Sequence, residues 1–139
     1  MKLLVIHGPN LNLLGQREPE IYGKETLENI NVLIKDECKK LGFKVEIKQF
    51  SCEGDIVDCI GKGEYDGLII NPAAYTHTSL AIADAIASVN KPAVEVHLSN
   101  IYKRESIRQK SLIAPVVKGQ ISGFGKYSYK LAVAYFAEI

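Results

Sequence analysis

The sequence has little that would suit a secreted scaffold, a membrane protein or a nucleic-acid-binding domain. Its three cysteines form no C-x-x-C pair, so we expect reduced thiols in a cytoplasmic protein and no zinc site. No apolar run is long enough to span a bilayer, and Pro9 interrupts the apolar start, which favours a first strand over a signal peptide. With three arginines and a net charge of +1, the chain has no clustered basic surface for nucleic acid or anionic lipid.

Motifs that bind common cofactors or supply a catalytic nucleophile are missing as well. The sequence has no Gly-rich phosphate loop, no Ser- and Thr-rich turn for a flavin phosphate and no acidic pair typical of a phospho-acceptor. The G-x-S-x-G elbow of a serine hydrolase is also missing. The polar residues that remain are amides, imidazoles and a few arginines, and these suit proton transfer on a small polar ligand.

Strand-like and helix-like segments alternate along the chain. Residues 26–41 carry apolar side chains at helical spacing, and Gly42 follows as a C-terminal cap. The patterns predict strands near 2–7, 45–50, 68–70, 93–98 and 120–122, and helices near 26–41, 56–60, 79–89 and 128–138. This alternation predicts one domain, 1–139, with an α/β fold: a flavodoxin-like doubly wound three-layer sandwich around a five-stranded parallel sheet.

Polar residues gather where three of the expected strands end. Asn10 follows the first strand, Asn71 and His77 follow the third, and His97 ends the fourth. Ligands of such folds bind outside the carboxyl ends of the strands. A single amide there is often only a turn former or a helix cap, but three polar clusters at adjoining ends are harder to assign to turns. We expect a ligand site at this edge and a structural role for His7.

The segment 8–24 shows no clear strand or helix pattern. A loop of this length in a small domain is usually functional or disordered. Arg17 and Tyr22 could close over the strand ends as a lid, where the guanidinium would lower the pKa of Tyr22 and make it a usable general base. An equally good interpretation is a surface loop with Tyr22 packed against the next helix.

The candidate acid is a histidine on the fourth strand. Glu95 and His97 are two residues apart, so their side chains point to the same face, and Glu95 could orient the imidazole and keep it protonated. The more ordinary interpretation is a partly buried structural histidine. His77 could similarly be a polar residue at a helix start. Arg108 could clamp a carboxylate or be exposed, and Asp84 could be a solvated helix residue or an interface residue.

Four motifs occur in order along the chain: GPNLNLLG, REPEIYG, NPAAYTHTS, and EVHLSNI followed by an arginine. With them the chain closely resembles the type II 3-dehydroquinate dehydratases over essentially its whole length. The resemblance implies a hydro-lyase that converts 3-dehydroquinate to 3-dehydroshikimate by anti elimination through an enolate. It also implies no metal or organic cofactor, a place in the shikimate pathway of aromatic amino acid biosynthesis or in quinate catabolism, and a homododecamer built from trimers.

The resemblance assigns roles to individual residues. Tyr22 would remove the C2 proton, with Arg17 lowering its pKa, and Asn10 would hold a water against the enolate oxygen. His97, oriented by Glu95, would protonate the departing hydroxyl. The positions that match the family's substrate-binding residues are Asn71, His77, Leu98 through its backbone, Ser99, Arg108 and, reaching into a neighbouring subunit's site, Asp84.

One segment departs from the family pattern. Where the family commonly has an Asn-His pair before Glu-Gly, this chain has Ser51 and Cys52, so local packing or assembly contacts are expected to differ there. On the residues alone, two other classes stay open. A non-catalytic flavodoxin-like module would bind a nucleotide or flavin, which a flavin absorbance spectrum would reveal. An interaction domain without chemistry would tolerate changes at Tyr22 and His97, apart from effects on stability.

Overall fold

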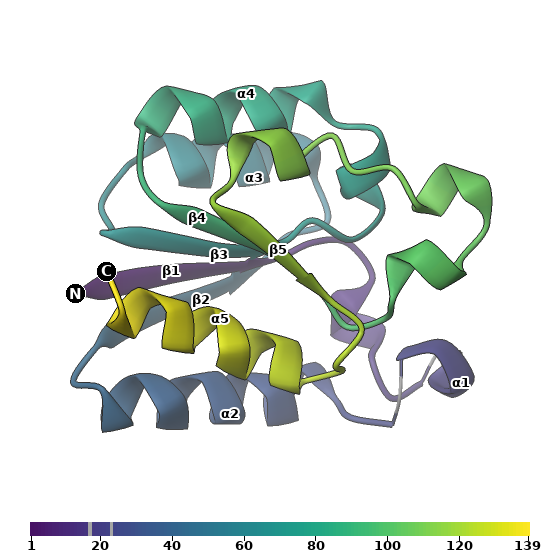
Figure 1. The fold of residues 1–139 in the computed structure, drawn as a ribbon, viewed down its shortest axis with the longest axis horizontal. Helices are drawn as coiled ribbons and strands as arrows, with labels where there is room; N and C mark the ends of the chain where they lie inside the picture. The colour runs from purple at the N-terminus through teal and green to yellow at the C-terminus, as the bar shows by residue number, and fades with distance from the viewer. Residues whose placement is uncertain (17, 23) are drawn as a thin grey trace.

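Among the residues that the computed structural model describes (1–16, 18–22 without the Tyr22 side chain, and 24–139), five parallel strands form a central sheet (Figure 1). The strands lie in the order β2-β1-β3-β4-β5. Their bounds are β1 (Lys2–His7), β2 (Lys44–Gln49), β3 (Gly67–Asn71), β4 (Ala93–His97) and β5 (Gly119–Ser122). All five carboxyl ends therefore meet at one edge of the sheet, as the sequence predicted.

Helices cover both faces of this sheet (Figure 1). Helices α2 (Leu27–Lys40) and α5 (Tyr127–Ala137) lie on one face, and α3 (Glu53–Gly61) and α4 (Leu80–Val89) lie on the other. Two of the helices begin after side-chain caps, because Thr26 Oγ1 accepts from Asn29 N and Ser79 Oγ accepts from Ile82 N. None of these helices, nor any other in the described part of the chain, has the length and apolar character needed to cross a bilayer.

Two apolar clusters hold the layers together. Every residue of β3 and β4 is buried, because helices cover both faces of these central strands. Successive side chains alternate between the two clusters. The cluster under α2 and α5 includes Leu3, Val5, Ile69, Val94 and Val96, and the cluster under α3 and α4 includes Leu4, Ile6, Leu68, Ile70 and Ala93.

The segments between these elements hold short helical turns, and the sequence indicated such a piece only after the fourth strand. The segment 8–24, expected to lack helix, contains a 3₁₀ turn η1 (Leu11–Leu13) and a short helix α1 (Pro19–Tyr22). After β3 comes η2 (Ala73–His77), and after β4 come η3 (Ile101–Lys103), η4 (Ser106–Arg108) and η5 (Ala114–Val116). Elements of three to five residues are too short to show a helical period, so the sequence pattern could not reveal them.

Candidate active site

A pocket opens at the carboxyl edge of the sheet. Its walls come from the loop after β1, from η2, from the end of β4 and from the turns that follow β4. The lining mixes polar and apolar side chains, and its residues are Pro9, Asn10, Leu11, Leu13, Leu14, Asn71, Ala73, Ala74, His77, His97, Leu98, Ser99, Ile101, Arg104 and Arg108. The pocket thus lies where ligands of this architecture bind.

The loops after β1 and β3 are pressed together at the base of the pocket. Gly8 N donates to Asn71 O over 2.8 Å, and a Cβ on Gly8 would lie 2.5 Å from Pro72 O. A side chain at position 8 would therefore push the two loops apart. Beside this contact, Asn10 takes a left-handed backbone conformation at φ 69°, and its carbonyl accepts from Leu13 N to start η1.

A buried chain of hydrogen bonds fixes Asn71. His7 Nε2 lies 2.8 Å from Asn31 Oδ1, and because this oxygen only accepts, Nε2 carries the proton. His7 Nδ1 therefore accepts from the Tyr129 hydroxyl over 2.9 Å, and that hydroxyl in turn accepts from Asn71 Nδ2 over 3.2 Å. Burial lowers the pKa of His7 to about 4, so it stays neutral, and its expected structural role is confirmed.

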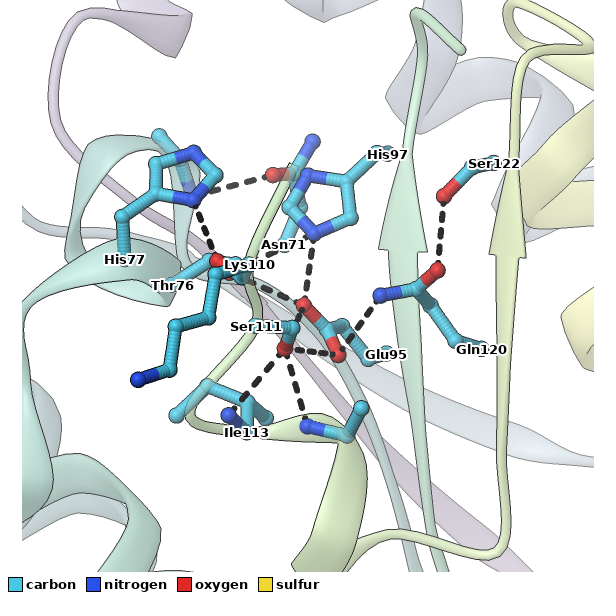
Figure 2. Close-up of polar contacts among 12 residues, drawn as sticks. Asn71, Thr76, His77, Glu95, His97, Lys110, Ser111, Ile113, Gln120 and Ser122 are labelled. Carbon is cyan, nitrogen blue, oxygen red and sulfur yellow. Dashed lines mark hydrogen bonds and ion pairs between the residues drawn. The ribbon is translucent and has the colours of Figure 1, made fainter. Parts of the chain in front are cut away.

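Glu95 and His97 form a buried pair on β4, with Glu95 behind the imidazole (Figure 2). His97 Nε2 lies 2.6 Å from Glu95 Oε2, which confirms that the two side chains share a face of the strand. Burial acts to raise the pKa of Glu95, but the hydrogen bond and charge of His97, with bonds from Gln120 and Ser111, hold that pKa below its usual range. The pair therefore places an ionised carboxylate against an imidazole that opens onto the pocket.

Other residues of the pocket supply cationic and hydrogen-bonding groups. His77 Nδ1 donates to the carbonyl of Lys110 over 2.7 Å, which leaves Nε2 for a ligand. Arg108 forms an ion pair with Glu105, three residues before it, and Arg104 Nη1 donates to Ser99 Oγ over 3.5 Å. Two guanidiniums beside two imidazoles make the pocket suitable for a small anion that carries hydroxyl groups.

Comparison with known proteins identifies the family. The family model described as Dehydroquinase class II matches residues 1–137. The chain belongs to the class II dehydroquinases. A 3-dehydroquinate dehydratase of Trichodesmium erythraeum is 58% identical over 133 residues, which cover 94% of this chain and 89% of that protein. One of Geotalea daltonii is 58% identical over 135 residues, covering 96% of this chain and 94% of that protein.

Solved class II dehydroquinases share the fold. The type II dehydroquinase of Butyrivibrio crossotus superposes with a TM-score of 0.96 at 45% identity, covering 100% of this chain and 98% of the other. The enzyme of Propionibacterium acnes gives a TM-score of 0.95 at 38% identity, covering 99% and 97%. The predicted α/β flavodoxin-like fold with a five-stranded parallel sheet is confirmed.

The structure brings together most of the residues that the class II dehydroquinase motifs predict. Seven of them line the pocket: Asn10, Asn71, His77, His97, Leu98, Ser99 and Arg108. Glu95 lies behind His97, whereas Asp84 is exposed on α4 and lies outside the described lining. Arg17 and the side chain of Tyr22 lie outside the described residues, so the lid that they would form stays a prediction.

Sequence reasoning missed four residues around this site. Arg104 lines the pocket beside Arg108, and Thr76, Ser111 and Gln120 contact Glu95. Arg104 could have been suspected because it is one of only three arginines, and Thr76 because it lies within the NPAAYTHTS motif, but Ser111 and Gln120 carry no sequence signal. Within the described residues, no group of three or more His, Cys, Asp or Glu side chains is arranged to hold a metal.

Proposed function

We propose that this chain removes water from 3-dehydroquinate to give 3-dehydroshikimate, in an anti elimination through an enolate. Membership of the class II dehydroquinases makes the chain a hydro-lyase that acts in the shikimate pathway. The observation that carries the proposed mechanism is the buried Glu95–His97 pair, which faces a pocket lined by amides, imidazoles and arginines.

The elimination requires one base and one acid. Tyr22 takes the proton from C2, which the neighbouring ketone of the substrate already acidifies, and the electron pair of that C–H bond forms the enolate. The enolate then forms the ring double bond as the C–O bond breaks, and His97 gives its proton to the departing hydroxyl to release water. Positioned proton transfer of this kind contributes about 10² to 10⁴-fold to the rate.

The geometry supports His97 in the acid role. Its Nε2 is occupied by Glu95, so Nδ1 is the nitrogen that would deliver the proton. The carboxylate of Glu95, whose pKa is held below its usual range, stays ionised behind the imidazole and accepts the hydrogen bond from its Nε2. In the same scheme, Arg17 keeps Tyr22 ionised, and Asn10 holds a water that hydrogen-bonds to the enolate oxygen.

The substrate's hydroxyls and carboxylate are bound by the rest of the pocket. The groups proposed to bind them are the side chains of Asn71, His77, Ser99 and Arg108 and the backbone of Leu98, all of which line the pocket. We further propose a cytoplasmic homododecamer built from trimers, in which Asp84 completes a neighbouring subunit's site. The exposure of Asp84 outside its own pocket supports this. Sedimentation velocity measures the assembly directly, and a monomer would contradict it.

The activity test follows the ultraviolet absorbance of the conjugated enone after purified protein is mixed with 3-dehydroquinate. We expect a steady rise, and a flat trace at micromolar protein would contradict the function. Tyr22→Phe and Arg17→Ala should each lower kcat by orders of magnitude while the unfolding temperature stays unchanged. Tyr127→Phe is the matched control, because Tyr127 is exposed on α5 and outside the described lining. Near-normal turnover by Tyr22→Phe would remove that residue from the base role.

A further inference from the structure

The carboxylate of Glu95 is surrounded by hydrogen-bond donors in addition to His97 (Figure 2). Its Oε2 atom accepts from Thr76 Oγ1 over 2.9 Å, as well as from the imidazole at 2.6 Å. Its Oε1 atom accepts from Ser111 Oγ over 2.8 Å and from Gln120 Nε2 over 3.1 Å. The side chain is 0% exposed, so these groups replace water as the solvation of a buried charge.

The Ser111 hydroxyl is fixed as a donor toward Glu95. Its oxygen accepts from the backbone N–H groups of Ile113 and Ala114, over 3.1 and 2.9 Å. With both lone pairs engaged, the hydroxyl proton points to the carboxylate. Ser111 thus links the start of η5 to the Glu95–His97 pair. The residue before it is Lys110, whose carbonyl accepts the hydrogen bond from His77.

The amide of Gln120 is fixed in the same sense. Its Oε1 atom accepts from Ser122 Oγ over 3.0 Å and from the Tyr102 hydroxyl over 3.2 Å. The opposite side of the amide, the Nε2 group, therefore faces Glu95 as a donor. Neither Gln120 nor Ser111 belongs to the described lining of the pocket, so changing them leaves the pocket wall in place.

We propose that Ser111 and Gln120 are positioning residues that keep Glu95 ionised both before and after His97 gives up its proton. A buried carboxylate beside a neutral imidazole would otherwise tend to take a proton itself. Donors aimed at the carboxylate favour its anion, so the mobile proton of the pair stays on His97 and is available to the substrate. The expected effect of these donors on turnover rests on the proposed acid role of His97. Their expected effect on the titration of the Glu95–His97 pair does not.

Other charged groups around the pair are left in place by the variants below. His77, Arg104 and Arg108 share the pocket with His97, and Tyr102 lies beyond Gln120. These groups contribute equally to the wild-type protein and to the variants. A difference between the wild-type protein and a variant in the titration of the Glu95–His97 pair therefore reports the loss of a donor to Glu95.

The decisive variant is Gln120→Met, which keeps the length of the side chain and removes the donor. Ser111→Ala removes the second donor but also leaves two backbone N–H groups unpaired, so Gln120→Met decides alone if the serine variant does not fold. Losing the donor lets the proton of the pair move onto Glu95. We expect kcat to fall about tenfold, with KM changed by less than about threefold. The basic limb of the kcat–pH profile should move up by about one pH unit, because the pair then holds its proton more tightly.

NMR titration of the His97 imidazole in the ligand-free protein provides the second measurement. Its midpoint should fall in Gln120→Met, because a proton that has moved onto Glu95 leaves the imidazole neutral, and it should stay unchanged in Gln109→Met, a matched control whose Nε2 donates to the carbonyl of Arg104 instead. An unchanged midpoint in Gln120→Met would overturn the inference, as would a loss of kcat without any shift of the pH profile. If the wild-type protein fails to dehydrate 3-dehydroquinate, the proposed function falls, while the NMR titration still decides the role of Gln120.

Discussion

The Tyr129 hydroxyl is a single group whose removal should affect both stability and the pocket. It stands in the middle of the buried chain that runs from Asn31 through His7 to Asn71. Tyr129 is 1% exposed, and burial raises the pKa of its hydroxyl, so it remains a neutral donor and acceptor at all working pH values. The substitution Tyr129→Phe deletes this hydroxyl and leaves the ring in place.

The magnitude follows from the two partners that lose a bond. His7 Nδ1 loses its donor, and Asn71 Nδ2 loses its acceptor, both in a region closed to water. An unpaired buried polar group costs about 1–3 kcal/mol, so with two such groups Tyr129→Phe should lower the free energy of unfolding by about 2–6 kcal/mol. Because Asn71 lines the pocket, its freed amide should also raise KM for 3-dehydroquinate.

Urea unfolding followed by circular dichroism measures the stability, and initial rates measure KM. Tyr135→Phe is the control on the same helix, because its ring keeps its edge contact with Phe136 after the hydroxyl is removed. It should lose less than about 1 kcal/mol. A loss this small in Tyr129→Phe, with KM unchanged, would refute the reasoning, because it would show that neither partner depends on the hydroxyl.

Three further predictions follow from positions near the base of the pocket. His7 stays neutral in the folded protein down to about pH 4, whereas in the unfolded chain its imidazole takes up a proton below about pH 6.5. Between these two pH values the free energy of unfolding should therefore fall by about 1.4 kcal/mol per pH unit, or about 3 kcal/mol in total. Urea titrations of His7→Gln should show a flatter dependence over that range, and an equal slope would contradict the assignment. Gly8→Ala places a Cβ against Pro72 O, so it should lower the free energy of unfolding by roughly 1–3 kcal/mol and should also lower kcat/KM. A wild-type value of either quantity would show that the two loops can move apart. Ala73→Gly should not lower the unfolding temperature, because Ala73 has a positive φ of 54°. Glycine relieves about 1–2 kcal/mol of backbone strain there, which offsets the greater entropy of the unfolded chain. A clear drop in a thermal scan would count against this prediction.

The sheet and its helices were predictable because their patterns are long and consistent. The alternation of Val45 and Ile47 with charged residues marked the edge strand β2, and continuous apolar runs marked the central strands. The helical spacing of apolar residues marked α2, and the segment rich in Ala and Ile after Ser79 marked α4. The rule that parallel strands present their carboxyl ends together then located the site before any contact was known.

The parts that could not be predicted depend on contacts between distant residues. Ser111 and Gln120 reach Glu95 from 16 and 25 residues away, and neither carries a local pattern. Arg104 lines the pocket just after η3, where it donates to Ser99 Oγ. The pairing of Arg17 with Tyr22 stays a prediction from the motifs, so the base half of the mechanism depends on the kinetic variants more than the acid half does.

The two walls of the pocket differ in how they are anchored, and this has a consequence for local opening. Asn71 and His97 end strands whose residues are all buried between two apolar clusters, so their amides should exchange with solvent only when the whole domain unfolds. Arg104 follows the three-residue turn η3 and Arg108 ends the three-residue turn η4, and short, largely solvated turns of this kind open at a much smaller free energy. Hydrogen exchange should therefore be slow for the amides of Asn71 and His97 and fast for the amides around Arg104 and Arg108. In mild denaturant the protein would release its hold on the anionic end of the substrate while the proton donor remains in place.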